Sequence, residues 1–360
     1  MQVRLQGDTK MWITRSLRPH CPKNMFSNTG IGYGTFMRTN RVLTDRCIET
    51  ERQRLYVWGR TAAERKMLRR REQAGELIRV HNSWPCYARA DSWNMLNPVE
   101  QYRRLVRTLA LQHPSWLFGD MTAAAMYGIN DSLRHMNAVH IMTNRSQHSH
   151  NWGSVRYHLL TDAERSQCAV VDGVRVTSLG RTVFDCARRL DFPDGMCVVE
   201  SVLRNRLMSR SGMREHCQTL SGKFRAKALR VVDQAPGGTE NGGEAYTYAV
   251  IVDEGFMAPH VQEVIIDQHD LSRSYRVDFS WHTSHGRFIV AELDGRVKYR
   301  DPSMLKNGSL EETIISEKER EENIRLQADE VVRLSFGDAY HRQRLIWKLE
   351  KAGVPRVPRG

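Results

Sequence analysis

The stretch YRVDFSWHTSHGRFIVAELDG, residues 275–295, decides how the C-terminal part of this 360-residue chain folds. Polar and apolar residues alternate in YRVDFSW (275–281), RFIVAELDG (287–295) forms a second strand, and the HTSHG between them is typical of a turn. The pattern therefore predicts a β-hairpin. A turn centred between Ser284 and His285 places Asp278 opposite Ala291 or Glu292.

Acidic side chains gather on one face of this hairpin. Because side chains alternate between the two faces of a strand, Glu292 and Asp294 project together, and Asp278 joins them in the second register. The other face is apolar and carries Val277, Phe279, Trp281, Ile289, Ala291 and Leu293. Carboxylates this close repel one another and need a cation, which for oxygen ligands is Mg²⁺ or Mn²⁺. The alternative is an ordinary amphipathic hairpin with exposed acids that pair with arginines, namely Arg276, Arg287 and Arg296.

The elements around the hairpin follow a definite order. A helix with Glu240 and Glu244 one turn apart is expected upstream, and a strand over 261–266 follows it. Downstream, the pattern predicts a charged helix over 311–327, a strand over 330–336 and a closing helix over 340–351. The order is helix, three strands, helix, strand, in which the last strand returns parallel to the sheet through a right-handed crossover.

With RVDF (276–279) and VAELDG (290–295), this order resembles the restriction-endonuclease-like PD-(D/E)XK superfamily, and within it the very-short-patch-repair-like branch. Residues 317–323 and 331–336 match the closing helix and strand of that branch. The resemblance covers about the last 120 residues. It implies a magnesium-dependent or manganese-dependent nuclease fold in this part of the chain.

The same resemblance implies roles for individual residues. Asp278 and Glu292 would bind the metal, the Leu293 carbonyl would offer a third oxygen, and Glu244 would bind the metal or its water. The lysine that the superfamily places two residues after the second acid is here Asp294, and Lys298 would take its charge-stabilising role. The predicted catalytic residues are therefore Asp278, Glu292, Lys298 and Glu244. The predicted metal ligands are Asp278, Glu292, Glu244 and, from the hairpin geometry, Asp294.

The N-terminal part shows a different pattern. A helical stretch runs from Leu43 through Leu55 and Val57 and breaks at Gly59, and Thr61 then caps a helix that ends at Gly75. Two short apolar runs, 77–80 and 86–88, follow as a small hairpin, which is the order of a winged helix-turn-helix. The second helix presents a basic stripe of Arg65, Lys66, Arg69, Arg70 and Arg71.

The run LRRREQAGELIRV (68–80), followed by CYA (86–88), resembles the N-terminal winged-helix domain of the AbiEi antitoxin family. This resemblance implies DNA binding through the second helix. The charge distribution agrees, because the net charge of the chain is +13 and the first 80 residues carry 17 Lys or Arg against 7 Asp or Glu. Acidic lipid would also attract such charges, but no broad apolar helical face accompanies them.

The sequence predicts an α+β multidomain protein. We expect a poorly ordered leader over 1–40, a winged helix-turn-helix over 41–92, a helix-rich middle domain over 93–235 and a restriction-endonuclease-like αβββαβ domain over 236–360. In the middle, PSWLFGDMTAAAMYG (114–128) and TSLGRTVFDCARR (177–189) are expected as helices and resemble bacterial proteins that join an AbiEi-like winged helix to a nuclease-like tail. His148 and His150 form an HxH motif that is more typical of a polar loop than of a metal site.

Composition limits the setting of the protein. No stretch of 18 apolar residues and no signal sequence occurs, so we expect a cytoplasmic protein without membrane contact. Seven cysteines without a CxxC pair predict reduced, mostly packed thiols. The first functional hypothesis is a Mg²⁺-dependent DNA endonuclease targeted by the winged helix. The alternative is an AbiEi-like antitoxin or transcriptional repressor with an inactive nuclease-fold tail, which Asp294 in place of lysine favours. DNA is the expected partner, and a homodimer or a cognate toxin remains open.

Overall fold

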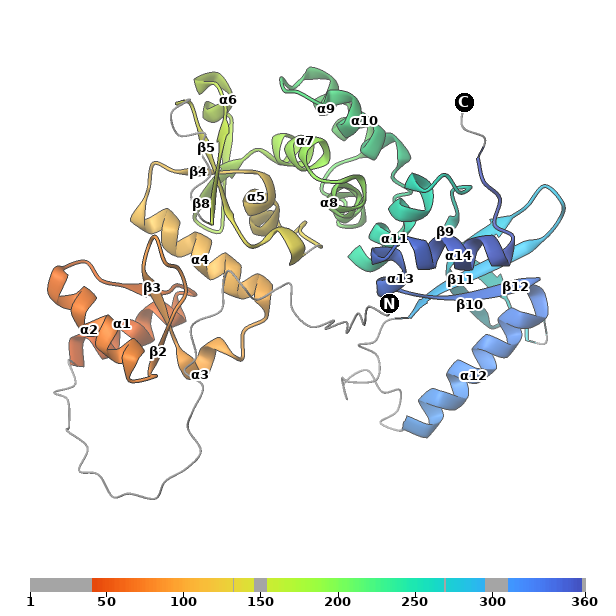
Figure 1. Ribbon diagram of the computed structural model, residues 1–360, viewed down its shortest axis with the longest axis horizontal. Helices are drawn as coiled ribbons and strands as arrows, with labels where there is room; N and C mark the ends of the chain where they lie inside the picture. The colour runs from red at the N-terminus through yellow and green to blue at the C-terminus, as the bar shows by residue number, and fades with distance from the viewer. Residues whose placement is uncertain (1–40, 132, 146–153, 269, 295–309, 358–360) are drawn as a thin grey trace, which may run out of the picture. The chain divides into compact units, whose positions relative to one another are not determined.

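The computed structural model describes residues 41–131, 133–145, 154–268, 270–294 and 310–357 (Figure 1). The predicted leader over 1–40 lies outside these residues. Helices and three β-sheets make up the described chain, which confirms a mixed α and β protein of more than one compact part. One unit comprises the described residues of Met1–Gly128 and Leu133–Thr182, and the other those of Ile129–Ser132 and Val183–Gly360. The predicted boundaries at 92 and 235 fall inside these units. None of the described helices is both long and apolar enough to cross a membrane.

The first unit begins with a small α/β module. Its elements are α1 (Arg41–Arg52), β1 (Val57–Trp58), α2 (Ala62–Gln73), β2 (Leu77–Arg79), β3 (Cys86–Arg89) and α3 (Ala90–Trp93). The three strands form an antiparallel sheet in the order β1-β3-β2. The predicted helix through Leu55 and Val57 is wrong, because α1 ends at Arg52 and Val57 pairs with Tyr87 of β3.

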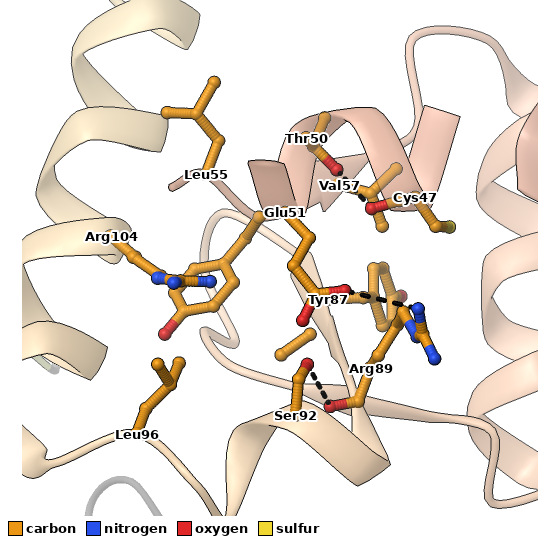
Figure 2. Close-up of a pocket in the computed structure, with 12 residues that line it drawn as sticks. Cys47, Thr50, Glu51, Leu55, Val57, Tyr87, Arg89, Ser92, Leu96 and Arg104 are labelled. Carbon is orange, nitrogen blue, oxygen red and sulfur yellow. Dashed lines mark hydrogen bonds and ion pairs between the residues drawn. The ribbon is translucent and has the colours of Figure 1, made fainter. Parts of the chain in front are cut away.

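Helix α2 has the predicted ends. The Thr61 side chain accepts a hydrogen bond from the Glu64 N–H, and the Glu64 carboxylate accepts one from the Thr61 N–H, so a capping box satisfies the first turn. After the helix, Gly75 takes a φ of +78°, a conformation that other residues rarely adopt. Leu68 anchors α2 in a core shared with Leu43, Cys47, Val57, Leu77 and Tyr87. The pocket beside this core is about 10 Å³, room for about one water molecule (Figure 2).

The rest of the first unit is built on a five-stranded sheet. Its elements are α4 (Pro98–Gln112), β4 (Leu117–Phe118), α5 (Asp120–Tyr127), β5 (Val139–Thr143), β6 (Val155–Leu159), α6 (Asp162–Ser166), β7 (Cys168–Val171) and β8 (Val174–Thr177), with a 3-10 turn at Leu133–His135. Helix α7 (Leu179–Arg189) begins in this unit and continues into the second one. The strand order is β6-β5-β4-β8-β7.

This sheet departs from the predicted helix-rich middle domain. Helix α7 ends at Arg189 as expected but begins at Leu179, because Thr177 belongs to β8. The helix expected over 114–128 is confined to α5, because Leu117 and Phe118 are drawn into the sheet, where Phe118 pairs with Ile141 of β5 and Val176 of β8. The strands contain two to five residues each, which is too short for a clear alternating pattern.

The second unit joins a set of helices to a four-stranded sheet. Its elements are α8 (Phe192–Arg204), α9 (Arg210–Thr219), α10 (Arg225–Gln234), α11 (Gly242–Asp253), β9 (His260–Ile266), β10 (Ser274–His282), β11 (Phe288–Asp294), α12 (Leu310–Gln327), β12 (Glu330–Ser335), α13 (Phe336–Tyr340) and α14 (Gln343–Ala352). The sheet has the order β12-β11-β10-β9, antiparallel except for the parallel pair β11 and β12. The predicted order helix, three strands, helix, strand is confirmed.

Of the two registers expected for the central hairpin, the structure has the one that sets Asp278 opposite Glu292. Phe279 pairs with Ala291 and Trp281 with Ile289, so the next position along each strand sets Asp278 opposite Glu292. Phe279, Trp281 and Ile289 are completely buried. Six described cysteines are free thiols and five of them are buried, as expected.

Candidate functional site

Three acids come together in the second unit, each from a different element. Glu244 stands in the first turn of α11, Asp278 on β10 and Glu292 on β11. The Gln262 side chain, from β9, donates hydrogen bonds to Glu244 Oε2 at 2.9 Å and to Asp278 Oδ1 at 3.2 Å. The backbone N–H of Leu293 donates to Asp278 Oδ2 at 2.8 Å. We call Glu244, Asp278 and Glu292 the acidic cluster.

Glu244 is held by the start of its own helix. Asn241 caps α11, and its side-chain amide donates to Glu244 Oε1 at 2.5 Å. The N–H of Glu240 donates to Glu244 Oε2 at 2.7 Å. Glu244 is only 3% exposed, and this burial, with the nearby charge of Asp278, raises its pKa to about 7. Hydrogen bonds therefore fix the position of the Glu244 carboxylate, but little positive charge nearby offsets its negative charge.

Glu292 has a similar environment and one cationic partner. It is 6% exposed, and Arg320 of α12 donates to its Oε1 at 2.7 Å. Burial raises the pKa of Glu292 to about 7, with Arg320 acting to lower it and the Asp278 charge adding to the rise. Asp278 thus opposes the ionisation of both glutamates, so the cluster favours an added positive charge.

The remaining predicted residues of this region lie elsewhere. Asp294 is exposed at the end of β11 and pairs with Arg333 at 3.4 Å. Glu240 forms an ion pair with Arg276. Lys298 lies outside the described residues, as do His148 and His150 of the HxH motif.

The donor set of the acidic cluster suits a hard divalent cation. All its donors are carboxylate oxygens, which Mg²⁺ and Mn²⁺ prefer. Within the described chain, the only three His, Cys, Asp or Glu whose ligand atoms all lie within 4.8 Å of one another belong to a different group, Asp120, His140 and His158. The acidic cluster is therefore spread more widely, with the Gln262 amide between Glu244 and Asp278.

Two residues of this site were missed in the sequence. Gln262 lies in β9 with a φ of +56°, a strained conformation for a residue with a side chain. Arg320 reaches Glu292 from α12. The β-branched residues of VQEVII (261–266) indicate a strand but not its register against β10, and the register is what sets Gln262 beside Asp278.

Four residues of the predicted basic stripe are exposed in the structure, and the fifth turns inward. Arg65, Lys66, Arg69 and Arg70 are exposed on α2, and we call these four residues the basic surface. Arg71 turns inward instead. Its guanidinium donates to Thr44 Oγ1 of α1 at 2.7 Å and lies 3.8 Å from the Glu76 carboxylate, which leaves its side chain 12% exposed.

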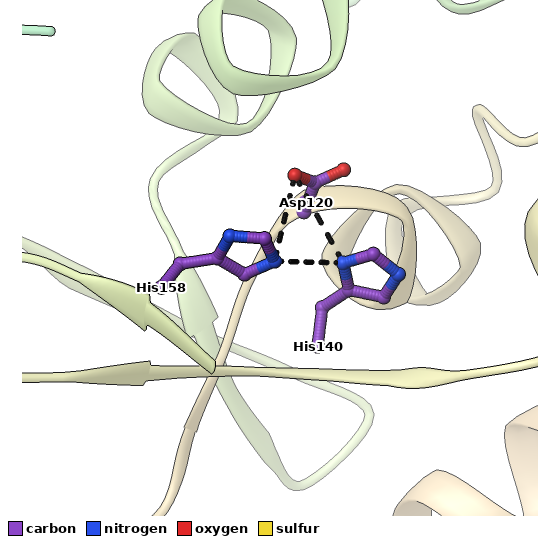
Figure 3. Close-up of side chains that lie close together, drawn as sticks. All are labelled: Asp120, His140 and His158. Atoms are coloured by element: carbon purple, nitrogen blue, oxygen red, sulfur yellow. Dashed lines mark hydrogen bonds and ion pairs between the residues drawn. The ribbon is translucent and has the colours of Figure 1, made fainter. Parts of the chain in front are cut away.

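A third group, in the first unit, was not predicted. Asp120 at the start of α5, His140 on β5 and His158 on β6 point toward one another (Figure 3). This group could hold a metal ion. Its members are separated in sequence and belong to no short motif. The pairing of β5 with β6 brings the two histidines together, and the start of α5 adds Asp120.

No protein-family model matches the chain, and no curated protein matches it significantly. What the protein does is therefore inferred from the acidic cluster, the basic surface and the Asp120, His140 and His158 group.

Proposed function

We propose that the protein is a DNA endonuclease that hydrolyses phosphodiester bonds with Mg²⁺ or Mn²⁺. The observation that carries the proposal is the convergence of Glu244, Asp278 and Glu292 from α11, β10 and β11. The element order around them is the one that the PD-(D/E)XK resemblance implies. The small α/β module with its basic surface then serves as an AbiEi-like winged helix that binds DNA, because exposed cations neutralise phosphates.

The residues of the acidic cluster would hold the cation, and their neighbours would keep them in place. Gln262 orients Glu244 and Asp278, and the Leu293 N–H fixes the second oxygen of Asp278. Arg320 supplies a positive charge beside Glu292, where negative charge develops on a phosphate during hydrolysis. A bound cation would provide a water of lowered pKa and neutralise charge in the transition state.

A cleavage assay tests this function. Purified full-length protein is incubated with plasmid or single-stranded DNA in Mg²⁺ or Mn²⁺, beside the variants Asp278→Asn and Glu292→Gln. Loss of either acid should lower the cleavage rate at least about a hundredfold. Glu319→Gln, which changes an exposed acid of α12, is the matched control and should cut like wild type. Wild type that cuts no faster than Asp278→Asn contradicts the nuclease function.

The sequence departs from the PD-(D/E)XK pattern at Asp294, and this favours a second function. An AbiEi-like antitoxin or repressor would bind DNA and a cognate toxin, or form a homodimer, with an inactive tail. Asp294 stands where a lysine is expected and pairs with Arg333. DNA binding without any cleavage by the wild type would support this alternative.

A further inference from the structure

We propose that Asp120, His140 and His158 form a second metal site, specific for a divalent transition metal ion such as Zn²⁺. The site lies in the first unit and shares no residue with the acidic cluster. Its ligands would be one carboxylate oxygen and two imidazole nitrogens, a set that suits transition metals rather than Mg²⁺.

The distances between the three ligand atoms fit one ion. His140 Nδ1 lies 2.9 Å from His158 Nε2, and Asp120 Oδ2 lies 3.9 Å from the first nitrogen and 3.8 Å from the second. The point equidistant from these atoms is about 2.1 Å from each, which matches Zn–N bonds of about 2.0–2.1 Å and Zn–O bonds of about 2.0–2.2 Å. The three atoms are therefore spaced closely enough for one ion to contact all of them.

The sheet sets the two histidines beside each other. Strands β5 and β6 run parallel, with His140 paired to Arg156 and Met142 to His158, so both histidines stand on one face two positions apart. Their rings are nearly parallel, at 9° and 5.1 Å between centroids. Their side chains are 14% and 19% exposed, so an ion has access from solvent.

The start of α5 aims the carboxylate at this pair. Asp120 is 2% exposed and has a φ of +52°, a strained conformation for a residue with a side chain. The N–H of Met121 donates to Asp120 Oδ1 at 2.8 Å, which leaves Oδ2 directed at the two rings. Thr122 Oγ1 accepts from the N–H of His140 at 2.8 Å, so α5 and β5 are tied together.

Asp120 Oδ2 lies near both ring nitrogens without a direct hydrogen bond to either of them. The two ring nitrogens are at hydrogen-bond distance, but 3.8 and 3.9 Å from Asp120 Oδ2 exceed it. One ion between the three atoms is compatible with all three distances. Three protein ligands are also the number found in zinc sites that keep a fourth, exchangeable position for water or a ligand.

Metal binding by the full-length chain tests the site. The protein carries Asp278→Asn and Glu292→Gln, so that the acidic cluster does not contribute, and is freed of metal with a chelator. Zn²⁺ alone is titrated by calorimetry, and Co²⁺ is followed by its visible absorption. We expect one equivalent of Zn²⁺, a rise in Tm on its addition and the absorption bands of Co²⁺ bound to nitrogen and oxygen. Because the acidic cluster is already disabled, the result is independent of the nuclease proposal.

Single-ligand variants locate the ion. Asp120→Asn, His140→Gln and His158→Gln should each weaken Zn²⁺ binding at least about tenfold and remove the rise in Tm. His341→Gln, an exposed histidine of the second unit, is the matched control. Binding that is unchanged in all three variants, or absent from the parent protein, overturns the proposal. Should one variant fail to fold by circular dichroism, the other two and the Co²⁺ spectrum of the parent decide.

Discussion

Replacing the four residues of the basic surface with alanine should change how DNA binding depends on salt. Arg65, Lys66, Arg69 and Arg70 are exposed, and each phosphate contact adds about 0.9 to the slope of log K against log salt. If each of the four makes one contact, the quadruple variant loses about 3.6 of that slope. A rise from about 50 to about 200 mM salt would then cost the variant about a hundredfold less affinity than it costs wild type.

Fluorescence anisotropy of a labelled duplex, measured over this range of salt with a chelator present, gives the slope directly. Arg71→Ala is the informative control, because Arg71 belongs to the predicted stripe but holds Thr44 and Glu76 instead of facing solvent. That variant should lower Tm and leave the slope unchanged. Lys351→Ala, an exposed cation in the second unit, controls for net charge. A quadruple variant with the slope of wild type would refute the assignment of DNA binding to α2.

Three further predictions concern stability. Burial first, and the charge of Arg79 second, lower the pKa of His81 to about 4, and its Nδ1 accepts from the Trp84 N–H. The unfolded chain therefore takes up this proton between about pH 6.5 and 4 while the folded chain does not, so His81 by itself should lower the free energy of unfolding by about 2 kcal/mol from pH 7 to pH 5. Urea titrations of wild type and His81→Asn at both pH values measure this contribution as a difference between the two proteins, because the raised pKa values of Glu244 and Glu292 act in the opposite direction in both. Gly119→Ala should cost about 1–3 kcal/mol and lower Tm in a thermal melt, because its Cβ would lie 1.9 Å from Met142 Cε in a buried site. Thr61→Ala should cost about 1 kcal/mol in a urea titration by removing the cap of α2.

The parts of the fold that sequence predicts well are those that local chemistry specifies. A capping residue at Thr61 and a left-handed glycine at Gly75 define α2 within a few residues. Alternation over 275–281 indicates β10, and the mostly apolar run after the turn indicates β11. The five-stranded sheet cannot be predicted from the sequence. Its strand β4 has only two residues and acquires its strand conformation only by pairing with β5 and β8.

Some residues of the candidate site can likewise be predicted from the sequence, and others cannot. The turn position limits the partner of Asp278 to Ala291 or Glu292, and the observed pairing of Phe279 with Ala291 sets Asp278 opposite Glu292. Gln262 and Arg320 cannot be found that way, because one depends on the register between β9 and β10 and the other on how α12 packs. Arg71 shows the converse: a residue in the right stripe leaves it because Thr44 offers its guanidinium a partner.

The two groups of candidate ligands differ in the cations that they select, and this makes their roles separable. Oxygen donors alone favour Mg²⁺ or Mn²⁺ at Glu244, Asp278 and Glu292, whereas two imidazoles favour a transition metal at His140 and His158. A protein site usually binds Mg²⁺ weakly and leaves several waters on the ion, so dialysis removes it. An ion held by histidines stays bound when the protein is diluted or dialysed. A dialysed preparation that retains Zn²⁺ but cleaves DNA only after Mg²⁺ is added would therefore show that both sites function, each with its own metal.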